Sequence, residues 1–166
     1  MARGNAGASR RQGPAAGFSL LELVAVLVIV GVLAVFAAPR LTATQGITLS
    51  AVREQLAANI RYTQSLAMSR GQRYRINFAA NSYQITDMGG APVVQPVTAS
   101  TAPISVAPVT LSGYNPPLTG NYVAFDGRGA PYVSATAPLA GTATIILTWG
   151  ADAGSVSIAA ETGSVR

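Results

Sequence analysis

The chain reads GFSLLEL at residues 17–23, and its residues stay apolar from there to Ala38. The 21 residues from Phe18 to Ala38 carry one charge, that of Glu22. At a rise of 1.5 Å per residue, a helix of this length extends about 31 Å, enough to cross a hydrocarbon core of ~30 Å. The stretch therefore predicts a membrane-spanning helix.

The carboxylate of Glu22 lies about one helical turn inside this apolar stretch. A charge at that depth of a bilayer costs roughly a few kcal/mol unless it is paired, so an acid there indicates a function. The helix dipole favours a carboxylate near a helix N-terminus, but in lipid the group still needs a positive partner. A plain signal anchor that tolerates an acid near its end is the alternative.

The segment before the apolar stretch, residues 1–17, is rich in Ala, Gly, Arg and Ser and holds Arg3, Arg10 and Arg11 without any acid. Basic residues ahead of a first apolar span favour keeping that end in the cytoplasm. A secretory signal places its small-residue cleavage site after the apolar core, whereas Gly17 comes before it. Cleavage at Gly17 would therefore leave the apolar helix on the mature chain.

This junction resembles the leader junction of type IV prepilins and of type II secretion pseudopilins. The similarity covers about 24 residues, up to Arg40, with Gly17, Phe18, Glu22 and Pro39 each at the position that the family expects. The rest of the chain resembles the family more loosely. It is most similar to the H-type minor pseudopilins (FimT/GspH-like) and their minor-pilin relatives.

The resemblance implies that a prepilin peptidase cleaves after Gly17 and that the new amine of Phe18 is N-methylated. The mature chain would then have 149 residues (166 − 17). In the family, the partner of the carboxylate at the Glu22 position is taken to be the N-terminal amine of a neighbouring subunit, and this pairing would fix the stagger between subunits. A pair with the amine of Phe18 in the same chain is the alternative, which would anchor the chain but not assemble it.

The apolar stretch ends at Pro39, which lacks an N–H and disfavours helix at the residue before it, so a helix kink is expected there. Gly46 is a second position at which the helix is expected to bend. Apolar residues then recur at spacings of three and four, which predicts an amphipathic helix from about Ser50 to Ser69. Gly71 is expected to end this helix as a left-handed C-cap.

The period of the apolar pattern drops to two after residue 71, which predicts a hairpin of residues 72–78 and 83–88. The stretch 92–117 holds six prolines and is either a variable loop or a contact surface, with short edge strands at 104–106 and 109–111. Further strands are predicted at 121–125, 142–149 and 155–159.

Together these segments predict an α+β fold of the pilin type. A long N-terminal helix, made of a membrane half and an amphipathic half, would pack on a C-terminal antiparallel β-sheet head. The expected divisions are a cytoplasmic basic leader (1–17), a transmembrane and assembly helix (18–39), an amphipathic helix (40–71) and a periplasmic β-rich head (72–166).

The composition argues against an enzyme. The chain has no His, no Cys and no Lys, which removes the commonest general base, the thiol nucleophile and the Schiff-base lysine. Its Ser residues have no visible base partner. We therefore expect no catalytic residue and no cofactor.

Calcium is the metal to consider, because Asp126 and Asp152 each lie in a Gly-containing loop. Neither loop has the dense carboxylates of a calcium loop, and Arg128 beside Asp126 opposes a cation. We interpret both as turn-forming Asp and expect no metal site.

Nucleic acid is the alternative in function. The formal charge is +5, but three of the eleven Arg lie in the leader. The eight Arg after the leader are largely balanced by six acids. Arg70, Arg73 and Arg75 lie close together in the sequence, near Tyr62 and Tyr74. Binding driven by phosphate needs several converging cations, and three are few, so the pattern argues against nucleic acid as a partner.

The resemblance implies a structural subunit that is held in the bacterial inner membrane by a single span, with its N-terminus in the cytoplasm and its head in the periplasm. Its partners would be the prepilin peptidase, other pilin or pseudopilin subunits, membrane lipid and an inner-membrane assembly platform. The expected role is minor subunit of a type II secretion pseudopilus, assembled into a periplasmic or surface filament.

Two alternatives stay open. One is a minor subunit of a type IV pilus, including the mannose-sensitive haemagglutinin type, which the ending Ala38-Pro39-Arg40 resembles; the other is a DNA-uptake minor pilin. Major pilins generally carry a disulfide-closed loop, and the absence of Cys favours a pseudopilin or a minor pilin.

Overall fold

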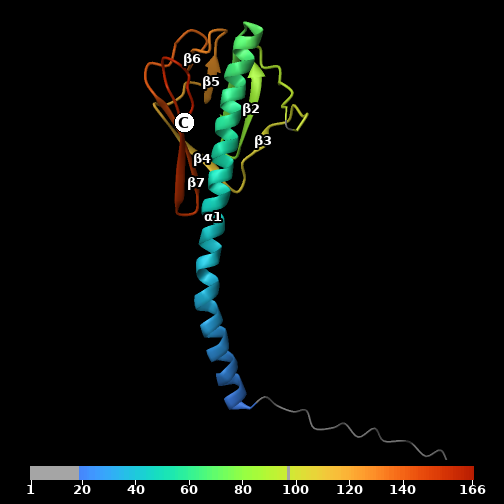
Figure 1. The fold of residues 1–166 in the computed structure, drawn as a ribbon, viewed down its shortest axis with the longest axis vertical. Coiled ribbons are helices and arrows are strands. Elements are labelled where there is room, and N and C mark those ends of the chain that lie inside the picture. Colours follow the sequence, from blue (N-terminus) through green and yellow to red (C-terminus); the bar gives the residue numbers. More distant parts are fainter. Residues whose placement is uncertain (1–18, 97) are drawn as a thin grey trace, which may run out of the picture. The chain divides into compact units, whose positions relative to one another are not determined.

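The computed structural model describes residues 19–96 and 98–166, without the side chains of residues 35–45. The chain divides into two compact units, Met1–Arg40 and Leu41–Arg166. One long helix, α1, is followed by eight strands that form the head (Figure 1).

Helix α1 spans Leu20–Arg70, 51 residues. It continues past Pro39 and Gly46, the two positions at which a bend was expected, so the two helical segments predicted from the sequence form one element. The predicted kink at Pro39 lies at the boundary between the two units and stays a prediction. The predicted C-cap is confirmed, because Gly71 follows the helix with a φ of 61°.

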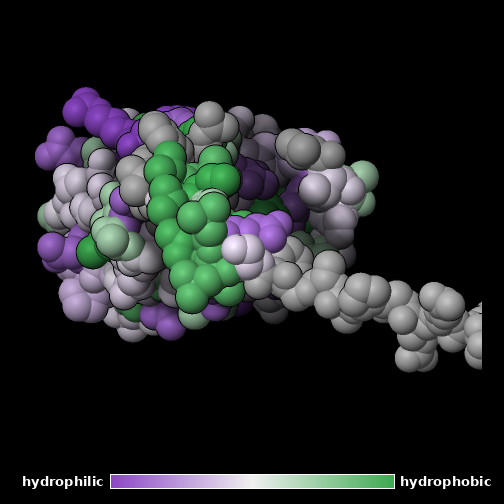
Figure 2. Space-filling view, turned by 90° about the horizontal axis from the view of Figure 1, so that it is seen from below, coloured by the Kyte–Doolittle hydropathy of each residue, from purple (hydrophilic) through white to green (hydrophobic). Residues whose placement is uncertain are grey.

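The N-terminal part of α1 exposes its apolar side chains. Every residue from Leu20 to Ala34 is exposed, and its large hydrophobic side chains form a continuous hydrophobic surface (Figure 2). No helix in the described part of the chain is both long and apolar enough to cross a membrane. The span predicted over 18–38 includes Phe18 and the side chains of residues 35–38, which lie outside that part.

The head has two antiparallel sheets, one of five strands in the order β3-β2-β1-β5-β6 and one of three in the order β4-β7-β8. The bounds of the strands are β1 Tyr74–Ala79, β2 Ser82–Asp87, β3 Ile104–Ser105, β4 Thr110–Asn115, β5 Tyr122–Phe125, β6 Pro131–Tyr132, β7 Ala143–Trp149 and β8 Asp152–Ile158.

The hairpin predicted from the period of two is confirmed. Strands β1 and β2 pair in register from Ala79 opposite Ser82 to Tyr74 opposite Asp87. Buried and less buried residues alternate along β1 and along β2 as far as Ile85, after which Thr86 is also buried. The Pro-rich stretch supplies β3 and β4. Strand β6 was not predicted, because its two residues include a Pro and show no period.

The core forms where one stripe of α1 meets the strands. Leu49, Leu56, Ile60, Thr63 and Ala67 are buried at the helical spacing predicted. Residues from both sheets belong to the same hydrophobic cluster as the helix: Ile76, Ile85 and Val123 from one, Ile145, Leu147 and Val156 from the other. Burying a large aliphatic side chain stabilises a fold by about 1.5–3 kcal/mol, so this stripe holds the head together.

We expect Ile60→Ala to lower the free energy of unfolding of the head by about 2–5 kcal/mol, because it leaves a cavity at a fully buried position. Chemical denaturation of the full chain in detergent, followed by the fluorescence of its one Trp, measures the change. Ser65→Ala, on the exposed side of the same helix, is the control and should change stability by less than about 0.5 kcal/mol.

Candidate functional site

The assembly site predicted from the sequence lies at the start of α1. Gly17 and Phe18 lie outside the described residues, so their cleavage and methylation stay predictions. Glu22 lies in the first turn of α1 with an exposed side chain. Neither of the ion pairs found among the described residues includes Glu22, and its pairing with a neighbouring subunit also stays a prediction.

In the head, polar side chains of α1 hold the helix to distant loops. The amide nitrogen of Gln64 donates hydrogen bonds of 2.9 Å to the carbonyl oxygens of Gly129 and of Thr162. The guanidinium of Arg61 donates one of 3.0 Å to the carbonyl of Val165. These bonds join the helix to the turn after β5 and to the C-terminal residues.

A fourth bond joins α1 to the hairpin. The side-chain nitrogen of Asn59 donates a hydrogen bond of 2.7 Å to the hydroxyl oxygen of Tyr83 on β2. Burial raises the pKa of Tyr83, and the bond from Asn59 opposes this only in part. The phenol therefore stays neutral and acts as a fixed contact.

Asp126 closes the turn after β5. One of its carboxylate oxygens accepts hydrogen bonds of 2.9 Å from the backbone N–H groups of Arg128 and Ala130. Burial raises the pKa of Asp126, but these two bonds and the charges of Arg128 and Arg73 outweigh burial and lower the pKa overall. The turn-forming interpretation of Asp126 is confirmed.

No group of three or more His, Cys, Asp or Glu that could hold a metal ion occurs in the described part of the chain. The other calcium candidate, Asp152, begins β8 and pairs with Trp149 across the β7–β8 turn.

The lowered pKa of Asp126 predicts that the head loses stability in acid. Because its pKa is lower in the folded than in the unfolded chain, its contribution is complete above about pH 5 and is lost as the pH falls through the folded pKa. We expect Asp126→Asn to lower stability at pH 7 by about 1–3 kcal/mol.

Denaturation of the full chain at a series of pH values between 7 and about 2 checks this, since the gap between wild type and variant should close at the acid end. Glu161→Gln removes an exposed acid of the head and is the matched control. A gap that stays constant with pH would contradict the role of the charge.

The structure separates the three Arg residues that lie close together in the sequence. The guanidinium of Arg73 lies 4.0 Å from the ring centre of Tyr132, and that of Arg75 lies 5.2 Å from that of Tyr122. Arg73 also donates to a backbone carbonyl, and Arg75 to the hydroxyl of Thr86. Both are half-buried on β1 or just before it, so they do not converge with Arg70.

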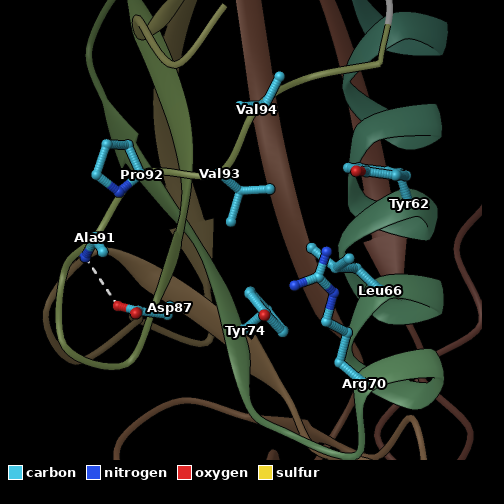
Figure 3. Close-up of a pocket in the computed structure, with 9 residues that line it drawn as sticks. All are labelled: Tyr62, Leu66, Arg70, Tyr74, Asp87, Ala91, Pro92, Val93 and Val94. Carbon is cyan, nitrogen blue, oxygen red and sulfur yellow. Dashed lines mark hydrogen bonds between the residues drawn. The ribbon is translucent and has the colours of Figure 1, made fainter.

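Arg70 lines a different place, a cavity of about 320 Å³ at the C-terminal end of α1 (Figure 3). Its walls are formed by Tyr62, Leu66 and Arg70 of the helix, by Tyr74 of β1, and by residues 91–94 together with the end of β2. The structure thus brings together three of the five residues of the basic and aromatic cluster seen in the sequence, around a cavity that the sequence did not predict.

Comparison with known families assigns the chain. A family model described as type II transport protein GspH matches residues 53–162, well over half of the chain. The chain belongs to this family. A second model, described as a prokaryotic N-terminal methylation motif, matches residues 14–38 of this GspH-family chain. The predicted resemblance to H-type minor pseudopilins is confirmed.

Two crystal structures of the type IV minor pilin FimU from Pseudomonas aeruginosa (strain PAO1), in space groups P65 and P21, are similar to this GspH-family chain. Each matches with a TM-score of 0.52 and 16% sequence identity, over 71% of this chain and over 90% and 86% of the respective FimU chains. This likeness shows the fold and confirms the predicted α+β pilin-like architecture. No curated protein matches the chain.

The residues that hold the GspH-family head to its helix were not predicted from the sequence. Gln64 and Asn59 are half-buried polar residues next to the buried stripe of α1. Their position beside the stripe was the one sign in the sequence that they contact the head. Their partners lie as far as 98 residues away, and no local pattern identifies a backbone carbonyl as an acceptor.

Proposed function

We propose that this chain is a structural minor subunit, a pseudopilin, of a type II protein secretion pseudopilus, rather than an enzyme. The observation that carries the proposal is the match of the head to the family model described as type II transport protein GspH. The methylation motif over residues 14–38 supports it, because it covers the junction that a prepilin peptidase would cut.

The mechanism is packing and charge pairing. A prepilin peptidase removes residues 1–17, and the Phe18 amine is methylated. The apolar side chains of residues 20–34 then face lipid before assembly and other subunits after it. Contiguous exposed apolar surface marks such a contact, and the large hydrophobic side chains of this segment are 49–82% exposed.

Glu22 sets the register of this packing. It is the one acid among residues 18–38, and a carboxylate in lipid needs a positive partner. The N-terminal amine of the neighbouring subunit supplies that charge, which removes two unpaired charges from the apolar filament core at once. The inner membrane anchors the subunit, with its N-terminus in the cytoplasm and its head in the periplasm, until the assembly platform adds it to the filament.

A minor subunit of a type IV pilus is the second candidate, and the fold shared with the minor pilin FimU favours it. Deletion of the gene separates the two. Loss of an exported enzyme from the medium with normal piliation supports the secretion pseudopilus, whereas loss of surface pili with normal secretion supports the pilus.

We expect the mature protein in its native membrane to begin at N-methylated Phe18 and to have 149 residues (166 − 17). Intact and N-terminal peptide mass spectrometry measures this. A chain that retains residues 1–17 in cells with an active prepilin peptidase would contradict the proposal and point to an ordinary signal anchor.

We expect Glu22→Ala to be cleaved normally but to enter filaments about 100-fold less, because the neighbour's ammonium is left unpaired in an apolar core at a cost of roughly 3 kcal/mol. The measurement is the fraction of the subunit in sheared filaments relative to that in the membrane. Glu54→Ala, which removes an exposed acid in the head-bound part of α1, is the control. Normal incorporation of Glu22→Ala would contradict the role of Glu22 in setting the register between subunits.

A further inference from the structure

The cavity at the C-terminal end of α1 has two firmly held walls. Tyr62, Leu66 and Arg70 are spaced four residues apart, so they lie along one side of the helix. The facing wall, residues 91–94, is fixed to β2 by hydrogen bonds: the N–H of Asp87 donates to the carbonyl of Ala91, and that of Val93 to Ile85. The cavity is therefore part of the folded head (Figure 3).

Three polar groups around this cavity have no partner among the described residues. The hydroxyls of Tyr62 and Tyr74 and the guanidinium of Arg70 make no hydrogen bond or ion pair there. Tyr74 is only 7% exposed, yet no buried side-chain oxygen or nitrogen in the described part lacks a partner. Its hydroxyl is therefore not sealed in the core but opens toward the cavity that it lines.

These groups suit a carboxylate. The guanidinium is a planar fork of donors that matches the two oxygens of a carboxylate, and each phenol supplies another donor. The one acid in the lining, Asp87, lies on the wall opposite Arg70 (Figure 3), and its carboxylate already accepts a hydrogen bond of 2.8 Å from the N–H of Ala91. Leu66, Pro92 and Val93 offer apolar contacts for a methylene stem.

We propose that this cavity binds the carboxylate of an Asp or Glu side chain presented by a neighbouring subunit of the filament, with Arg70 as its ionic partner. The proposal rests on the proposed function, because assembly brings the acidic residue to the cavity at high effective concentration. It assigns the start of the Pro-rich stretch, residues 92–94, as a contact surface. The competing explanation is that Arg70 only offsets the dipole at the end of α1.

The first experiment places a photo-crosslinking amino acid at Val94, an exposed position on the rim, in the full chain in its native cells. We expect crosslinks to another subunit, within a few residues of an Asp or Glu. Arg70→Gln should lower the crosslink yield about tenfold, as expected for loss of a charged hydrogen-bonded pair. Tyr74→Phe keeps the buried ring and should lower the yield less.

Arg53→Gln is the matched control, because it removes the same charge from an exposed position of the same helix, away from the cavity. It should leave the yield unchanged. Arg70→Lys keeps the charge that opposes the helix dipole but loses the bidentate fork, so it should lower the yield by an intermediate factor. Wild-type yield in Arg70→Gln would overturn the proposal.

The second experiment exchanges the charges. Arg70→Glu should abolish the crosslink, and changing the identified acid of the neighbour to Arg should restore it. Failure of this rescue, crosslinks to a segment without an acid, or crosslinks to lipid or a free small carboxylate would each overturn the proposal. Filament incorporation distinguishes failure of this proposal from failure of the proposed function. If the wild type enters filaments but substitutions of Arg70 do not change the crosslink yield, only the role of the cavity is wrong. If the wild type does not enter filaments, both proposals are wrong.

Discussion

The packing of one apolar stripe of α1 against two sheets holds the head together. Leu56 and Ile60 lie at the centre of this stripe and are fully buried, and both sheets contribute to the cluster around them. Small antiparallel sheets are marginal without a surface to cover one face. The helix supplies that surface for both, so the same element that is exposed and apolar near its start is the core-forming element near its end.

Polar groups beside the stripe fix how α1 is oriented on the sheets. The hydrophobic effect is roughly proportional to area and has no preferred direction, so it leaves rotation and sliding of a helix poorly determined. Asn59, Arg61 and Gln64 donate to one phenol and three backbone carbonyls in separate parts of the head. Those bonds specify one rotation and one height of α1 on the sheets, which is what a subunit needs if its helix and its head are to meet neighbours at once.

The parts of the fold that follow from local pattern were predictable from the sequence. The helical spacing along 49–67 and the period of two in β1 and β2 gave the buried faces correctly, and Gly71 gave the end of α1. The short strand β6 and the shift in register between Leu111 and Gly113 in β4 depend on long-range pairing, which no local window contains.

The candidate sites divide in the same way. The leader junction could be proposed because the residues that define it are consecutive, from Gly17 to Leu23. The cavity at Arg70 could not, because Tyr62 and Tyr74 reach it from a helix and a strand, and Val93 from a loop after β2. Nearness in sequence is not nearness in space here, since Arg73 and Arg75 lie close to Arg70 in the chain but stack on Tyr132 and Tyr122.

The bond from Arg61 to Val165 joins residues 104 positions apart, and the C-terminal residues also pair with β8 through Ile158 and Val165. Contacts of such long range form late, because the chain must first close a large loop. A chain made from its N-terminus therefore has α1 before the residues that cover it, and part of the helix surface stays uncovered until residues 158–165 have been made. The packing of α1 is thus completed by residues that lie far along the chain from the helix itself.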